Sequence, residues 1–416
     1  MTPSGAGSVQ GTPSGPVAES PDAGGLRWRM LALLSGAVLL GMSGWFSASA
    51  VAPELSRGWG LSAGQVGWLT TVVQLGFVAG TALAAVLNLA DVVPARLYFA
   101  ASALLAAAAN GALLVVPGFR WALVVRFLTG FFLAGVYPPG MKMVATWFRS
   151  ARGLAIGTLV GALTLGKAAP FLGKALGTAP LGPVVTGASL AGVAAALMVL
   201  AGYRDGPHAF ARRPFSWGLV GQVLRHRPTM LATGGYLGHM WELYAGWLLA
   251  APFFTAWYAL RGHPEAEALG ALWGFAVIAA GAVGAVVAGT WADRWGRGRV
   301  ANAAMAVSGI CSLTLGWLLA APVWVVGGVA LVWGTTIVAD SAQFSAVVTE
   351  VAPSHAVGTA LTLQTMLGFA LTGVSMQIGV GLADAVGWGP ALAVLALGPM
   401  AGIASIRRLA RLQARG

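Results

Sequence analysis

Residues 268–292 read ALGALWGFAVIAAGAVGAVVAGTWA, and not one of their side chains is charged. A helix of roughly 20 apolar residues is long enough to cross the hydrocarbon core of a bilayer. Further charge-free runs of that length lie at 30–53, 58–90, 97–119, 175–203, 356–383 and 385–406. The sequence therefore predicts a chain whose solvent is lipid, with helices that cross the membrane many times.

The composition agrees with this prediction. Hydrophobic residues make up 57% of the chain and charged residues only 9%, whereas a soluble domain carries roughly a quarter charged residues. The net charge of +12 would suit nucleic acid, but the Arg residues fall in short clusters between apolar runs, which is typical of membrane topology. We therefore expect the lipid bilayer, and no nucleic acid, as a partner.

Motifs of enzymes and metal sites are missing from the sequence. There is no His-Glu-x-x-His, no paired Cys, no Gly-x-Ser-x-Gly and no phosphate-binding loop, and the single Cys311 excludes a disulfide framework. The loops are too short to fold a catalytic domain. We expect no enzyme activity, no metal and no cofactor.

The apolar runs add up to twelve predicted helices. The run 300–339 is too long for one span and is divided at Pro322, and three further runs contain a few embedded charges. The fold class is an all-α membrane protein, with helices near 30–53, 64–90, 97–117, 121–146, 153–176, 180–203, 229–257, 267–291, 300–320, 323–349, 356–380 and 388–406.

The distribution of basic residues predicts the orientation. Seventeen Arg residues fall on one side of the predicted membrane and four Lys or Arg on the other, and the side that is rich in Lys and Arg is the cytoplasm. Both termini are then cytoplasmic, as a Gly, Ser and Pro-rich disordered tail over 1–28 and a basic tail over 407–416. Arg outnumbers Lys 21 to 3, which is typical of a GC-rich bacterial genome, so we expect the protein in a bacterial inner membrane.

The chain also contains an internal repeat. A polar loop at 204–228 separates two halves, 29–203 and 229–406, and similar residues recur in them at a nearly constant offset of 202 to 205. Duplicated bundles with a site at their interface are a plan of secondary transporters. The matching pairs are Asp91 and Asp293, Gly130 and Gly334, and Gly153 and Gly358.

A loop motif between the eighth and ninth helices resembles the signature of the major facilitator superfamily. The stretch 289–297 supplies Gly289, Asp293, Arg294, Gly296 and Arg297 at the spacing of that signature. Its first-half copy keeps Asp91 and Arg96 but has Leu87 in place of the Gly, and Arg126 with Gly130 resembles a second motif of the superfamily.

The resemblance implies two pseudo-symmetric six-helix bundles, transport by alternating access, and a monomer. Gly289 would allow two helices to pack closely, and Asp293 would bond a helix N-terminus or an Arg, as the helix dipole favours. This motif would then be a cytoplasmic gate. The competing interpretation is a basic loop that only sets topology.

Six ionisable residues lie inside predicted helices, where they are costly and therefore candidates for function: Arg126, Lys142, Lys167, His239, Glu242 and Asp340. Lys142 lies near the cytoplasmic end of its helix, where its long side chain can reach the interface, so we interpret it as structural. The resemblance implies that helices 1, 4, 7 and 10 line a central cavity. Candidates for substrate binding or proton coupling are Arg126, Lys167, His239, Glu242, Asp340 and Gln343, together with Trp45 and Tyr244. His239 and Glu242 share one helix face, as do Asp340 and Gln343, and Glu242 and Lys167 both lie about 20 Å into their helices.

Two roles compete at each of these residues. Glu242 and Asp340 either carry protons or form permanent salt bridges, for instance Glu242 with Lys167 or Arg126. Lys167 either binds an anionic substrate or only compensates charge, and Trp45 is either a wall of the site or an ordinary packed side chain. Three prolines, Pro138, Pro139 and Pro170, are candidates for kinks that change during alternating access.

The substrate is predicted only by class. The stretches around 137–140, helix 7 and helix 10 resemble a bacterial subgroup similar to nitrate/nitrite or cyanate porters, but 58–90 and 268–292 lack the Arg residues expected of nitrate porters. We expect proton-coupled transport of a small organic or inorganic anion. One alternative is a proton-driven drug or metabolite efflux antiporter, because the stretch 166–173 with Pro170 resembles the antiporter signature, although Ala169 stands where that signature has Gly. The other alternative is a non-transporting membrane sensor.

Overall fold

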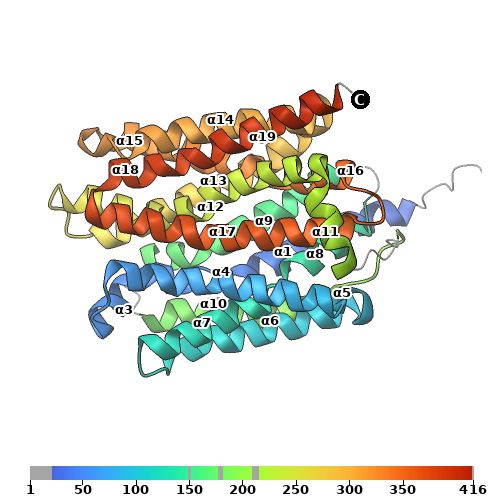
Figure 1. The fold of residues 1–416 in the computed structure, drawn as a ribbon. Coiled ribbons are helices and arrows are strands. Elements are labelled where there is room, and N and C mark those ends of the chain that lie inside the picture. The colour runs from blue at the N-terminus through green and yellow to red at the C-terminus, as the bar shows by residue number, and fades with distance from the viewer. Residues whose placement is uncertain (1–20, 149–150, 177–180, 209–214, 415–416) are drawn as a thin grey trace, which may run out of the picture.

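The computed structural model describes residues 21–148, 151–176, 181–208 and 215–414. Figure 1 shows long helices that run side by side along one direction, with the beginning of the described chain and its C-terminal end at the same end of the bundle. We call that end the terminal face and the opposite end the distal face. Most of the predicted tail 1–28 lies outside the described residues, and the first helix begins at Pro21.

Among the described residues of the first half, all regular secondary structure is helical. These are α1 (Pro21–Met42), α2 (Ser47–Ala50), α3 (Ala52–Trp59), α4 (Ala63–Val86), α5 (Leu89–Val92), α6 (Ala95–Gly111), the short 3-10 helix η1 (Ala112–Leu114), α7 (Phe119–Leu133), α8 (Tyr137–Ala145), α9 (Arg152–Leu176) and α10 (Leu181–Gly202).

The second half repeats this plan after the central loop. Its elements are α11 (Trp217–Arg225), α12 (Arg227–Ala259), α13 (Ala266–Trp295), α14 (Arg297–Leu315), η2 (Leu318–Ala320), α15 (Val323–Ala339), α16 (Ser341–Val351), α17 (Val357–Ala385), α18 (Trp388–Ala393), η3 (Val394–Ala396) and α19 (Leu397–Gln413). Helix α11 lies within the predicted loop 204–228 and was not expected.

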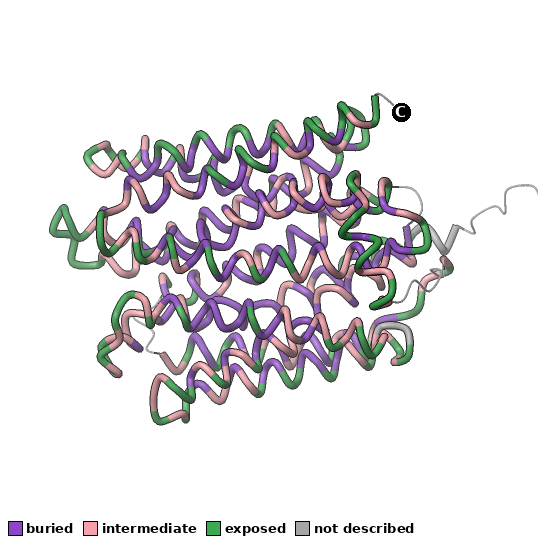
Figure 2. The backbone as a smooth tube through the Cα atoms, viewed as in Figure 1, coloured by how far each residue is buried: buried purple, intermediate pink, exposed green. Residues whose placement is uncertain are grey.

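The predicted all-α membrane fold is confirmed. Within the described part of the chain, ten stretches are long and apolar enough to cross a membrane, and α12 and α14 run alongside them (Figure 1), which is consistent with twelve spans. Buried positions line the interior and exposed ones the outside of the bundle (Figure 2). Large apolar side chains such as Trp121, Leu190, Ile310 and Trp324 are exposed, as expected of surfaces that face lipid.

Several of the predicted helices are interrupted, among them the first, the fourth and the tenth. The first breaks between Met42 and Ser47, the fourth between Leu133 and Tyr137, and the tenth at Asp340. The break in the fourth helix directly precedes Pro138 and Pro139, because proline cannot donate the hydrogen bonds that would continue α7 into α8. Pro170, by contrast, lies inside a continuous α9.

The two halves repeat the same close helix contacts. A Cβ atom on Gly130 would lie 2.0 Å from the carbonyl oxygen of Val73, and one on Gly334 would lie 2.0 Å from that of Val277. Helices α4 and α7 in the first half are therefore packed as α13 and α15 are in the second. Small residues allow such contact in lipid, where apolar burial no longer drives association.

These contacts predict that Gly284→Ala destabilises the protein. A Cβ atom on Gly284 would lie 1.8 Å from the carbonyl oxygen of Thr335, so α13 and α15 must separate. We expect a loss of about 1–3 kcal/mol, measured by thermal unfolding in detergent. The control Gly328→Ala lies in α15 with no atom near its Cβ position, and it should be neutral or more stable. Equal effects of both changes would contradict this packing.

Candidate functional site

Lys167 lies at the interface of the two halves, enclosed by aromatic rings. Its Nζ atom contacts the hydroxyl of Tyr244 and lies 3.8 Å from the ring centroid of Trp45, 4.4 Å from that of Tyr244 and 5.6 Å from that of Trp247. Lys167 and Trp45 belong to the first half, and the two other rings belong to α12. We call these four residues the Lys167 cage.

The Lys167 cage holds more hydrogen-bond donors than acceptors. No described carboxylate pairs with Lys167, which is almost fully buried, and the indole nitrogens of Trp45 and Trp247 are buried without a hydrogen-bond partner. An ammonium group removed from water without a counter-charge is costly. The aromatic rings around the ammonium group offset part of this cost through cation–π attraction.

Arg126, on α7, donates hydrogen bonds to backbone groups at the interruption between α1 and α2 in the first predicted helix. Its guanidinium donates to the carbonyl oxygen of Gly44 (2.9 Å) and the side-chain oxygen of Asn110 (2.9 Å), and it also contacts the carbonyl oxygen of Trp45. Longer bonds reach Ser47 Oγ (3.1 Å) and the carbonyl oxygen of Leu69 (3.4 Å). Arg126 therefore satisfies backbone groups that the interruption between α1 and α2 leaves free.

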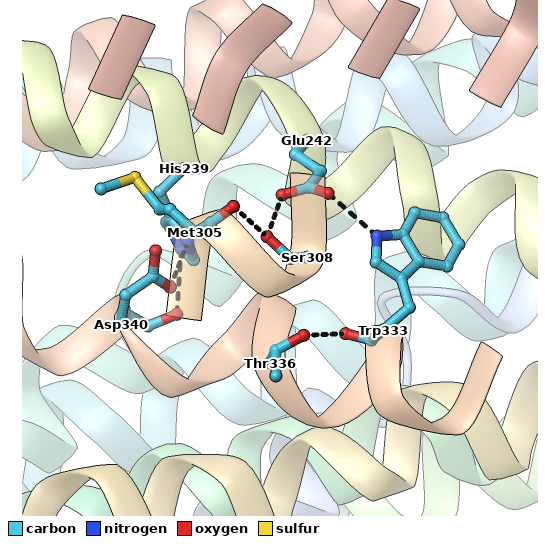
Figure 3. Close-up of polar contacts among 8 residues, drawn as sticks. His239, Glu242, Met305, Ser308, Trp333, Thr336 and Asp340 are labelled. Atoms are coloured by element: carbon cyan, nitrogen blue, oxygen red, sulfur yellow. Dashed lines mark hydrogen bonds and ion pairs between the residues drawn. The ribbon is translucent and has the colours of Figure 1, made fainter. Parts of the chain in front are cut away.

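Glu242, on α12, lies inside the second half and not in the Lys167 cage. Its carboxylate accepts hydrogen bonds from Ser308 Oγ (2.7 Å), Ser312 Oγ (2.5 Å) and the indole nitrogen of Trp333 (2.9 Å); Figure 3 shows the contacts with Ser308 and Trp333. The interpretation of Glu242 as a salt-bridge partner of Lys167 or Arg126 is wrong in this structure, because α14 and α15 supply its partners.

His239 and Asp340 form a second buried polar group beside Glu242. The Nδ1 atom of His239 lies 2.7 Å from Asp340 Oδ1, and its Nε2 atom lies 2.9 Å from Ser341 Oγ. Asp340 occupies the junction between α15 and α16, and Figure 3 places this pair one helical turn from Glu242 along α12. Two carboxylates and one imidazole thus share the interior of the second half. Gln343, on α16, is also buried.

The loop motif joins the two halves near the terminal face. Gly289 packs against α9, since its Cβ atom would lie 2.9 Å from the carbonyl oxygen of Gly153, and the carboxylate of Asp293 lies over Gly153 at the beginning of that helix. A carboxylate at a helix N-terminus is favoured by the helix dipole. Gly296 adopts a φ of +88°, which favours glycine, at the turn between α13 and α14.

The other motif residues lie away from this contact. Arg297 pairs with Glu350 (2.7 Å) at the end of α16, and Arg294 is exposed. In the first-half copy Arg96 is exposed at the beginning of α6, while the side chain of Asp91 lies outside the described residues.

A cavity of about 470 Å³ lies between the halves near the distal face. Its lining combines first-half residues of α3, α4 and α9 with second-half residues of α12, α13 and α17. Phe171 and Leu248, which line it, are one helical turn from Lys167 and Tyr244. We call it the distal cavity. Nearer the terminal face, α9 and α13 pack so closely that a Cβ on Gly157 would lie 2.8 Å from the carbonyl oxygen of Ala285.

Comparison with known proteins identifies the family. The sequence model of the Major Facilitator Superfamily matches residues 33–376. The chain belongs to this superfamily.

Solved structures agree with the fold of the superfamily. The chain is similar to a bacterial homolog of the human lysosomal transporter Spinster, described as inward-facing and unoccupied, with 16% identity, coverage of 94% of this chain and 96% of that one, and a TM-score of 0.63. It is also similar to a mutant of the nucleoside transporter NupG, with 11% identity, coverage of 92% and 99%, and a TM-score of 0.68. A search of curated proteins gives no match.

Membership of the superfamily confirms the predicted fold and the general class of transporter. Predicted site residues separate into three groups: Lys167, Trp45 and Tyr244 meet at the interface, while His239, Glu242 and Asp340 lie inside the second half. Arg126 lies inside the first half. The resemblance to nitrate or cyanate porters finds no support in these comparisons.

Several site residues were missed by the sequence analysis. Trp247 lies three residues after Tyr244 on the same helix face, which the spacing could have indicated. Ser308, Ser312 and Trp333 carried no signal, because hydroxyls and indoles are common in membrane helices. Lys174 is one of the four Lys or Arg residues that the sequence analysis assigned to the less basic side of the membrane, yet its side chain is buried and lines the distal cavity.

Proposed function

We propose that the protein is a proton-coupled secondary transporter that binds a small anion at the Lys167 cage. The single observation that supports this is a buried lysine at the interface of the two halves with no carboxylate partner among the described residues. The halves of a superfamily transporter move against each other around their interface, so a ligand held there is exposed first to one side and then to the other.

The cage supplies the groups that an anion needs. Lys167 offers an ammonium group, Tyr244 a hydroxyl, and Trp45 and Trp247 two indole N–H groups without partners. Hydrogen bonds from such donors to a charged acceptor are about twice as strong as neutral ones. Because Lys167 and Trp45 belong to one half and Tyr244 and Trp247 to the other, a bound anion would draw the two halves together.

The buried acids of the second half support the proton step. Glu242 and the His239–Asp340 pair are enclosed with no Lys or Arg partner among the described residues. A carboxylate that is buried in one state and hydrated in another changes its proton affinity between the two. Protonation of this group is therefore the event that we couple to movement of the halves.

The orientation follows the distribution of basic residues. With the terminal face in the cytoplasm of a bacterium, the protein lies in the inner membrane and the distal cavity faces outward. The close contact of α9 with α13 then seals the cytoplasmic side in this structure. A single chain contains both halves, so we propose a monomer.

The test is uptake into proteoliposomes of the purified protein. A panel of radiolabelled anions, with nitrate, acetate, benzoate and hexanoate among them, is offered with and without an imposed pH gradient. We expect at least one anion to accumulate only with the gradient, and to exchange without it. Transport of uncharged or cationic compounds, with none of the anions taken up or competing, would contradict the proposal.

Glu242→Gln should separate exchange from accumulation. The amide keeps the shape of the carboxyl group beside Ser308 and Ser312 but cannot take up a proton. We expect counterflow to persist and accumulation to lose its dependence on the gradient, which for one proton per anion is about tenfold per pH unit. The matched control is Glu265→Gln, an exposed carboxylate of the same half. Gradient-driven accumulation by Glu242→Gln at the normal level would exclude Glu242 as the proton carrier.

A further inference from the structure

The distal cavity is apolar over most of its lining. Its walls include Ala50, Pro53, Phe171, Leu248 and Val380, contributed by both halves. A small inorganic ion would leave these walls without a partner, whereas a ligand with an apolar body would bury surface against them. The cavity therefore suits a ligand that is larger and less polar than nitrate or phosphate.

Only one charged side chain of the cavity lining is buried, and it is basic. Lys174 is 8% exposed. The two acids of the lining lie toward the rim: Asp384 is exposed, and Glu267 is paired with Arg57 at 2.6 Å and is 39% exposed in its side chain. That pair joins the two halves, and the hydrogen bond and charge of Glu267 raise the pKa of Arg57. The buried end of the cavity thus favours an anionic group.

Lys174 already holds a carboxylate, but one that is incompletely bound. Its partner is Glu54 of the short helix α3, and the second carboxylate oxygen of Glu54 is buried without a hydrogen-bond partner. A buried acceptor without a partner costs about 1–3 kcal/mol. The carboxylate of Glu54 therefore binds Lys174 where the carboxylate of a ligand would bind, and its unsatisfied oxygen weakens this ion pair. A ligand carboxylate can then replace Glu54 on Lys174.

Lys174 and Lys167 stand on the same face of α9. They are seven residues apart, which is about two turns or roughly 10 Å along the helix. Phe171 lines the distal cavity and Trp247 belongs to the Lys167 cage, and the ring of Phe46 contacts both, with its centroid 6.0 Å from that of Phe171 and 6.2 Å from that of Trp247.

We propose that the distal cavity binds an organic monocarboxylate with an apolar body, whose carboxylate replaces Glu54 on Lys174 before it moves to Lys167. This inference rests on the proposed function, because Lys167 is the second site that the carboxylate binds. It adds the substrate class and a separate outer site. Each of the two sites has one buried cation, Lys174 or Lys167, which matches one carboxylate, and the apolar walls of the distal cavity match the body of the ligand.

Binding to the purified full-length protein tests the ligand class. Isothermal titration with acetate, butanoate, hexanoate and octanoate should show a dissociation constant that falls by about fourfold for each methylene that the cavity buries. Octan-1-ol, which lacks the carboxylate, should bind at least tenfold more weakly than octanoate. Equal affinity across the series, or equal binding of octan-1-ol and octanoate, would overturn the inference.

Two variants test the exchange on Lys174. Lys174→Gln should weaken octanoate binding by at least about tenfold, the loss expected for a charged hydrogen bond. Glu54→Gln should strengthen it by roughly tenfold if Lys174 is free of Glu54 in about one molecule in ten. An ion pair with only a structural role predicts no gain in affinity, so unchanged or weaker binding by Glu54→Gln overturns the exchange.

Failure of this inference and failure of the proposed function give different results. If Lys167→Met abolishes anion transport while chain length has no effect on binding, the proposed function stands and the substrate class is wrong. If Lys167→Met transports normally, the proposed function is wrong, whatever the titrations show.

Discussion

Lys167→Met should abolish anion counterflow while the protein remains folded. Methionine keeps most of the volume and the apolar stem of the lysine but removes the ammonium group from the Lys167 cage. Truncating one partner of a buried charged pair costs about 2–5 kcal/mol, so anion affinity should fall by about 30-fold or more. Thermal stability should be unchanged or higher, because a buried charge without a counter-charge no longer has to be accommodated.

The measurement is counterflow in proteoliposomes, with thermal unfolding of the same preparations. Arg408→Met, a change of an exposed residue at the terminal face, serves as the control and should leave both values unaltered. Lys167→Arg keeps the charge but not the shape, and it should retain part of the activity. Normal counterflow by Lys167→Met, or equal losses of activity and stability, would mean that the lysine is structural.

Periodicity and charge were sufficient to predict the architecture. A run without charges must cross the lipid, so the ends of the helices follow from where Arg residues begin, and α4, α9 and α12 start within two residues of the predicted positions. The matched glycines indicated an internal repeat, and Gly130 and Gly334 do meet equivalent carbonyl groups in the two halves. Both results depend on the charge and size of individual residues, which can be read directly from the sequence.

The partners of the buried charges could not be predicted in the same way. Depth along a helix placed Glu242 and Lys167 at the same level, but not on facing sides, since the rotation of one helix relative to another is decided by packing. Glu242 turns toward Ser308 and Lys167 toward Trp45. The interruption between α1 and α2, where Arg126 donates its hydrogen bonds, could not be recognised in the sequence, because Gly44 is only one of the 60 glycines of the chain.

Arg126→Met should destabilise the protein far more than Lys167→Met. Removal of the guanidinium leaves the carbonyl oxygen of Trp45 buried without this donor, and it leaves the carbonyl oxygen of Gly44 and the side-chain oxygen of Asn110 to share the one hydroxyl of Ser47. A buried acceptor without a partner costs about 1–3 kcal/mol, and two such acceptors take a large part of the stability of a typical protein, which is about 5–15 kcal/mol. We expect very low yield of folded protein, measured by size-exclusion chromatography in detergent.

Two milder variants decide between this structural role and the predicted role of Arg126 in proton coupling. Arg126→Lys replaces the several nitrogens of the planar guanidinium, which reach several acceptors, with one ammonium nitrogen. This variant should therefore fold, but with a lower melting temperature. Ser47→Ala removes the 3.1 Å acceptor of Arg126 together with the hydroxyl that contacts the Gly44 carbonyl oxygen and the Asn110 side-chain oxygen, and it should still cost less than the loss of the whole guanidinium. A coupling residue would instead give Arg126→Lys normal stability and accumulation that no longer follows the pH gradient. Because the guanidinium meets carbonyl and amide oxygens and no described carboxylate, we expect the melting temperature, and not the pH response, to follow the number of hydrogen bonds that each variant retains.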